Sequence, residues 1–163
     1  MIDASTLDAL AEFPRRLEAH YAAFPARYKN WAPPSWDGVP SEPFTALAQI
    51  CHVRDIEIDG YHIRFARTLH ETNPNLPDVD GEALARERAY AHGRDSEVFA
   101  ALRHARAHSL TQISTWNEEQ LARPALFESR PVTLAGLVHA LCSHDQQHLA
   151  GLQWLLARIS AVT

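Results

Sequence analysis

The 163-residue chain has 46% hydrophobic and 21% charged residues, an ordinary composition for a globular protein, and its length suits one domain spanning residues 1–163. Its formal charge of -5 and its lack of a Lys/Arg cluster argue against a nucleic-acid surface, because phosphate binding depends on a basic patch. No apolar run reaches the roughly twenty residues of a membrane span, and the first residues do not resemble a signal peptide. We therefore expect a cytoplasmic protein that binds neither nucleic acid nor membrane.

Helical periodicity runs through most of the chain, and no segment of useful length alternates apolar and polar residues as a strand would. The first helical region is predicted from Thr6 to Tyr28, with Pro14 and Pro25 kinking or dividing it. The next segment, residues 30–43, contains four prolines, two tryptophans and a glycine. This composition is typical of a loop held by aromatic side chains, which can cover one end of a helical bundle.

The second helix is predicted from Glu42 to Glu71, with Ser41 as its N-cap and the Asn73-Pro74 pair just beyond its end. Its apolar face is formed by Phe44, Leu47, Cys51, Ile58, His62, Phe65 and Leu69.

A third helical region then reaches about Trp116, with an interruption expected at residues 93–95. Residues 117–132 form a connector, and Thr133 is the predicted N-cap of the last helix. Four main helices with long connecting loops predict an all-α, four-helix bundle.

The last helix carries two histidines, His144 and His148, one turn apart. Because a helix advances about 100° per residue, both fall on the apolar stripe of that helix, which is formed by Leu134, Leu137, Leu141, Leu152, Leu155 and Ile159. Burying two imidazoles is unfavourable unless each ring nitrogen finds a partner. A divalent metal shared by both rings meets this need, and a metal-free network with carboxylates or carbonyls is the alternative; the spacing favours the metal.

A second histidine pair has the same spacing but a different setting. His104 and His108 lie opposite the apolar side of their helix, so we expect them to be solvated. A third metal ligand is expected from the second helix, where His52 and His62 are the histidine candidates. Periodicity alone favours His62, because it lies nearer the middle of the apolar face than His52 does.

Three segments resemble the DinB superfamily, and the similarity covers nearly the whole chain. They are Trp36-Asp37-Gly38, the segment QICHVRD at residues 49–55, and the segment from Thr133 to His148 that ends in HDQQH. The resemblance implies an up-down four-helix bundle in which one histidine of the second helix and two of the last helix bind a divalent metal. Matched position by position, the ligands are His52, His144 and His148, so the resemblance selects His52 over His62.

The residues around these expected ligands match the superfamily less closely than the ligands do. Members of the superfamily often carry glutamine one turn after the final histidine, where this chain has Gly151, so a hydrogen bond near the metal is expected to be missing. Asp55 and Asp145 are candidates for orienting the ligand rings, because ligand histidines usually donate their other ring N–H to a carboxylate or carbonyl. The alternative is that both are ordinary helix-surface carboxylates.

A ligand set of three neutral histidines leaves the charge of the ion uncompensated, which lowers the pKa of a bound water or thiol. The resemblance implies a metal-dependent hydrolase, or a thiol S-transferase with a low-molecular-weight thiol as cosubstrate, acting on a small molecule; it also implies a homodimer. Zn or Ni is the expected ion, with Fe or Cu as alternatives. The competing interpretation is a non-catalytic, stress-associated binding module whose metal is structural or absent, so the sequence leaves open whether the protein is an enzyme.

Overall fold

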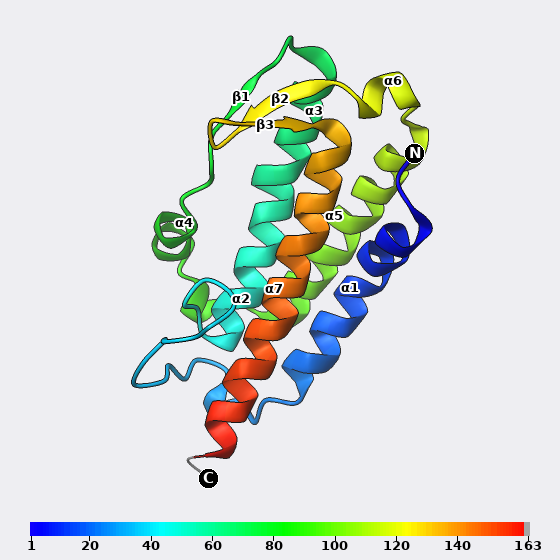
Figure 1. The fold of residues 1–163 in the computed structure, drawn as a ribbon. Helices are drawn as coiled ribbons and strands as arrows, with labels where there is room; N and C mark the ends of the chain where they lie inside the picture. The colour runs from blue at the N-terminus through cyan, green and yellow to red at the C-terminus, as the bar shows by residue number, and fades with distance from the viewer. Residues whose placement is uncertain (162–163) are drawn as a thin grey trace.

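A computed structural model describes residues 1–161 of the chain and consists of four long helices packed side by side (Figure 1). The long helices are α1 (Ala4–Ala22), the continuous helix formed by α2 (Ala46–Asp55), the π-helical segment η2 (Ile56–Tyr61) and α3 (His62–His70), then α5 (Asp95–Thr115) and α7 (Leu134–Ser160). The predicted four-helix bundle is confirmed. No helix within these residues combines the length and apolar character needed to cross a bilayer.

The directions of the helices do not simply alternate along the chain. The α2–α3 helix and α5 run the same way, whereas α1 and α7 run the opposite way (Figure 1). The connection over residues 71–94 therefore returns along the length of the bundle, carrying α4 (Gly81–Glu87) and η3 (Tyr90–His92). This return path interrupts the alternation expected of an up-down bundle, and it places α4 against α2.

A small sheet closes one end of the bundle, although no strand was expected from the sequence. Strand β1 (Asn75–Leu76) pairs in parallel with β2 (Pro124–Phe127), which pairs antiparallel with β3 (Arg130–Thr133). The strands are too short to show a clear alternation. The hairpin turn also lacks the usual Asn-Gly or Asp-Gly signal, because Glu128 and Ser129 adopt the two positive φ angles of 49° and 63°.

Two helix starts differ from the sequence prediction. Helix α1 begins at Ala4, ends at Ala22 and runs through Pro14 without a break. Helix α2 begins at Ala46 with Thr45 as its N-cap, rather than at Glu42. Because residues that precede proline disfavour the helical conformation, and Pro43 follows directly, Glu42 belongs to the loop before the helix.

Other predicted helix boundaries agree with the structure. Thr133 caps α7, as predicted, and the short helix α6 (Glu118–Leu121) lies in the connector that follows α5. The interrupted third region is resolved into α4, η3 and α5, and α5 begins at Asp95.

The proline-rich loop is held against α7 by aromatic stacking, as its composition indicated. The rings of Trp36 and Trp154 are stacked with centroids 6.0 Å apart, and the Arg158 guanidinium lies over Trp154. At the start of α2, the backbone N–H of Leu47 donates to the carbonyl of Lys29. These contacts fix the loop that brings Glu42 to the side of the bundle.

Two apolar clusters fill the interior, and polar side chains lie between them along the helices. One cluster includes Phe13, Leu17, Ile50, Leu102 and Leu152; the other includes Leu10, Phe65, Ile113, Leu134 and Leu141. The polar side chains between them include Gln49, His52, Glu57, Arg106, Asp145 and His148, all buried. Because buried polar groups need partners, a functional site is expected in this layer.

Candidate metal centre

The π-helical segment η2 decides which side chains of the second long helix face the interior. One extra residue in a turn rotates everything beyond it by about 100° relative to an uninterrupted α-helix. This explains why two members of the predicted apolar face leave the core, although Phe65 stays buried. Ile58 is 37% exposed, and His62 faces α5, where its Nε2 contacts the carbonyl of Ala105 and the hydroxyl of Ser109. His52, which precedes the π-helical segment, faces α7 instead.

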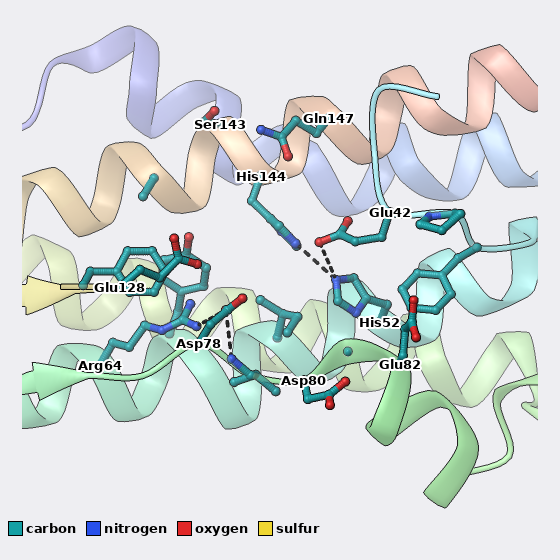
Figure 2. Close-up of a pocket in the computed structure, with 18 residues that line it drawn as sticks. Glu42, His52, Arg64, Asp78, Asp80, Glu82, Glu128, Ser143, His144 and Gln147 are labelled. Atoms are coloured by element: carbon teal, nitrogen blue, oxygen red, sulfur yellow. Dashed lines mark hydrogen bonds and ion pairs between the residues drawn. The ribbon is translucent and has the colours of Figure 1, made fainter. Parts of the chain in front are cut away.

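Three histidines and one glutamate converge where α2, α7 and the proline-rich loop meet. Figure 2 shows Glu42, His52 and His144 of this set. The Nε2 atom of His144 lies 3.4 Å from Nε2 of His52 and 3.2 Å from Nε2 of His148. The carboxylate of Glu42 lies 3.5 Å from His52 Nε2 and 3.0 Å from His148 Nε2. The structure thus brings together His52, His144 and His148, the three histidines selected by the family resemblance, and adds a carboxylate that sequence reasoning missed.

The four residues differ in burial. His52 is 2% exposed and His148 is fully buried, whereas His144 is half-buried and the Glu42 side chain is 44% exposed. Burial lowers the pKa of His148 and, with the two neighbouring imidazoles, holds the pKa of His144 well below its ordinary value of 6.5. The neighbouring rings of His148 and His52 lower the pKa of Glu42. The arrangement therefore favours neutral rings at His144 and His148 beside an ionised carboxylate.

The donor set fits a divalent cation. His148 Nδ1 lies 2.9 Å from Gln49 Oε1, a carbonyl oxygen that can only accept, so the ring proton of a neutral His148 lies on Nδ1. Its Nε2 then presents a lone pair to the Glu42 carboxylate, which is unfavourable without a cation between them. His52, His144, His148 and Glu42 each offer one ligand atom, and these atoms lie within 4.8 Å of one another. A divalent ion held by this set would satisfy all of them.

Gln49, rather than Asp55 or Asp145, contacts the ring of a candidate ligand histidine. Gln49 is fully buried on α2 and its Oε1 contacts His148 Nδ1. A Cβ atom added to Gly151 would meet both amide atoms of Gln49, at 2.8 and 3.0 Å, as well as the Ser41 hydroxyl. Gly151 therefore leaves room for Gln49 from another helix, which contacts the His148 ring.

The His52 ring is held by packing. Its Nδ1 is buried and has no hydrogen-bond partner among residues 1–161. A Cβ atom on Gly81, the first residue of α4, would come within 2.9 Å of that nitrogen, and the ring of Phe44 lies 5.0 Å away between centroids. The close approach of Gly81 fixes the ring without a hydrogen bond.

The two predicted orienting aspartates bind arginines instead, which corrects that expectation. Asp55 accepts from Arg54 Nε at 2.6 Å and from the Tyr90 hydroxyl at 2.7 Å, and it forms an ion pair with Arg88. Asp145 forms an ion pair with Arg106. The alternative of surface carboxylates is also wrong, because both side chains are buried.

Asp145 belongs to a buried charge cluster behind the candidate metal centre. Arg106 forms an ion pair with Asp145 (Nη1 to Oδ2, 2.8 Å) and two hydrogen bonds to the Glu57 carboxylate, at 2.8 and 2.9 Å. The Ser109 hydroxyl also donates to Glu57. Because Asp145 follows His144 directly, this cluster anchors the part of α7 that carries His144 and His148.

A pocket of about 510 Å³ opens beside the candidate metal centre. Glu42, His52 and His144 line one end, and Arg64 and Glu128 line the other (Figure 2). The second histidine pair, His104 and His108, is exposed, as expected. The histidines that face the pocket are thus those of the buried layer.

A four-helix bundle whose second and last long helices present histidines to a pocket defines a class of candidate metal-binding proteins. This chain belongs to the DinB superfamily, whose family model matches residues 9–152. Its structure is similar to that of YfiT from Bacillus subtilis, described as "a probable metal-dependent hydrolase with an unusual four-helix bundle topology", with a TM-score of 0.84 and 20% sequence identity over 98% of this chain and 91% of that one. No curated protein sequence matches the chain.

Proposed function

We propose that this protein is a metal-dependent hydrolase that acts on a small molecule. His52, His144 and His148 are the ligands of a divalent ion, for which Zn and Ni are the first candidates. The observation that carries the proposal is the convergence of three imidazole nitrogens and a carboxylate, with His52, His144 and Glu42 lining a pocket of 510 Å³. Similarity in fold to YfiT, itself described as a probable metal-dependent hydrolase, supports it.

The side chains have distinct roles in this proposal. A divalent ion in such a site supplies Lewis acidity and lowers the pKa of water. His52 and His148 are buried and fixed by packing and by Gln49, so they hold the ion in place. Glu42 comes from a loop and is exposed to the pocket, so its carboxylate can accept a proton from an attacking water as general base.

The same ligand set would also stabilise a thiolate, so a thiol S-transferase is the neighbouring proposal. Neither Cys51 nor Cys142 lines the pocket, and burial raises the pKa of both thiols. The thiol in such a reaction would therefore come from a low-molecular-weight cosubstrate.

One observation favours a different class of function. Glu42 lies close enough to His52 and His148 to complete a set of four protein ligands, and closed sets of four are typical of structural metal sites. In that case the protein is a binding module, and its metal contributes to folding rather than to catalysis.

Two variants separate these proposals. Glu42→Gln and His148→Ala are compared with the wild type in hydrolysis of a panel of activated esters and amides, with and without added thiol, alongside metal content. For a hydrolase, we expect Glu42→Gln to keep its metal and lose about a hundredfold in rate, and His148→Ala to lose both. Glu82→Gln, an exposed carboxylate on the same pocket, is the matched control and should keep both.

The contradicting result concerns stability. If no substrate is turned over, and chelation of the wild type strongly lowers the free energy of unfolding, the metal is structural and the hydrolase proposal fails. Turnover only in the presence of a thiol would favour the S-transferase.

A further inference from the structure

Two arginines are almost completely buried in the bundle, and their charges are neutralised to different degrees. Arg106 is bonded to two buried carboxylates, those of Glu57 and Asp145. Arg64 on α3 is 4% exposed; its Nη2 donates to Asp78 at 3.1 Å, and its buried Nε has no partner among residues 1–161. A buried guanidinium with an unused donor is unfavourable, so Arg64 has capacity to bind a further acceptor.

Aromatic rings fix the plane of the Arg64 guanidinium. Its Cζ lies 4.8 Å from the ring centroid of Tyr61 and 4.4 Å from that of Phe127 on β2. Stacking of this kind favours arginine and holds its fork of donors in one orientation. Because Nε and Nη2 lie along one edge of the guanidinium, a carboxylate can accept from both, whereas Asp78 accepts from Nη2 alone.

Asp78 is a weak and replaceable partner. Its side chain is 62% exposed and lies in the connection between β1 and α4. The same oxygen also accepts from the backbone N–H of Val79, so it is shared between two donors. Ion pairs with an exposed member contribute little to stability, so another carboxylate can take its place at Arg64.

Arg64 lines one end of the pocket, and His52 and His144 line the other (Figure 2). Tyr61 connects the two ends, because its ring contacts Arg64 and its centroid lies 6.4 Å from that of His144. Arg64 is the only lysine or arginine among the described residues that line the pocket. A small molecule could therefore reach both Arg64 and the histidines.

We propose that Arg64 binds a carboxylate of the substrate, and that Asp78 occupies this position in the free protein. The inference rests on the proposed function, since it names the substrate class of the same pocket. This class is a small carboxylic acid whose carboxylate and reacting group lie on opposite sides of the Tyr61 ring. Asp80, Glu82 and Glu128 also line the pocket. Their negative charge disfavours a dianion, so a monocarboxylate fits better than a phosphate.

An NMR titration of the metal-loaded, 15N-labelled protein tests this directly. The probe is butyrate, and butyramide and inorganic phosphate are the comparison probes. Butyrate should produce saturable shifts at the Arg64 Nε–H and the Phe127 amide, butyramide should produce none, and phosphate should bind more weakly than butyrate.

Two variants change the affinity in opposite directions. Asp78→Asn should tighten butyrate binding about threefold, because it removes a competing exposed carboxylate. Arg64→Met should weaken binding by roughly tenfold or more, because charge-assisted hydrogen bonds are lost. Arg67→Met is the matched control, since Arg67 lies on the same helix and pairs with the exposed Glu71; it should bind butyrate as the wild type does.

Several results would overturn the inference. Unchanged butyrate affinity in Asp78→Asn is one, and it stands even if Arg64→Met fails to fold, because Asp78 is exposed. Shifts confined to the surroundings of His144, or tighter binding of phosphate than of butyrate, are others. Repeating the titration after chelation separates this inference from the proposed function: butyrate binding at Arg64 in the metal-free protein supports the carboxylate site even where no hydrolysis is found.

Discussion

Gln49 on α2 contacts His148 on α7 through Oε1 and Nδ1, which lie 2.9 Å apart. This contact places the ring proton of His148 on Nδ1 and leaves Nε2 free to bind a metal. It also ties the second long helix to the last one at the level of the candidate metal centre. Gln49 is therefore a positioning residue for the site.

Replacing Gln49 by leucine should weaken metal binding. Loss of the partner that orients a ligand histidine typically costs about 10- to 100-fold in metal affinity. Competition with a chromophoric chelator measures the affinity of the variant. Gln146→Leu, an exposed position on α7, is the control and should bind metal as the wild type does; an equal loss in both variants would argue against a specific role for Gln49.

Replacing Gly151 by alanine should also weaken metal binding, because the added methyl group displaces the Gln49 side chain. The added Cβ would overlap the ends of the Ser41 and Gln49 side chains, which can move away at little cost. We expect the free energy of unfolding to change by less than about 1 kcal/mol, since alanine also favours the helix, while the metal affinity falls as in Gln49→Leu. The double variant should lose no more than either single one, because both remove one interaction.

The buried cluster around Arg106 should be important for stability. Arg106→Met leaves the carboxylates of Glu57 and Asp145 without their partner, and breaking a buried ion pair in this way costs about 3–5 kcal/mol. Urea unfolding measures the loss. Arg103→Met on the same helix removes an exposed pair with Glu18 and should cost less than about 1 kcal/mol; equal losses would contradict the account.

The stability of the metal-free protein should depend on pH through His144. Because burial holds the pKa of His144 well below 6.5, the unfolded chain takes up a proton here that the folded chain does not as the pH falls below about 6.5. The free energy of unfolding should therefore fall with falling pH in this range. His144→Gln removes the titrating group, so the stability of the wild type relative to the variant should be constant above about pH 6.5 and should fall as the pH is lowered below it. A difference that is independent of pH would contradict the prediction.

The sequence predicts the bundle well, because the long helices carry strong apolar periodicity and Thr133 is a clear N-cap. It does not reveal η2, since a π-helical turn leaves no simple pattern of residues. For that reason, a continuous helical face favoured His62. Family resemblance, rather than periodicity, selected His52, and the structure places His52 beside His144 and His148.

The surroundings of the candidate site were harder to predict, because they depend on contacts between distant segments. Glu42 was assigned to a helix, and only its position in the loop before Ala46 brings its carboxylate to the histidines. Gln49 lies one turn before His52, which is a weak signal that both face the same way. Asp55 and Asp145 were assigned roles from proximity in sequence, yet their directions on the helices lead them to arginines.

The most direct test of the central claim is the metal content of tag-free protein, measured by elemental mass spectrometry for the wild type and three histidine variants. We expect about one divalent ion per chain in the wild type and in His62→Ala, and little metal in His52→Ala and His148→Ala. A wild type that holds no metal after supplementation with Zn or Ni, or a His148→Ala variant that keeps it, would contradict the account.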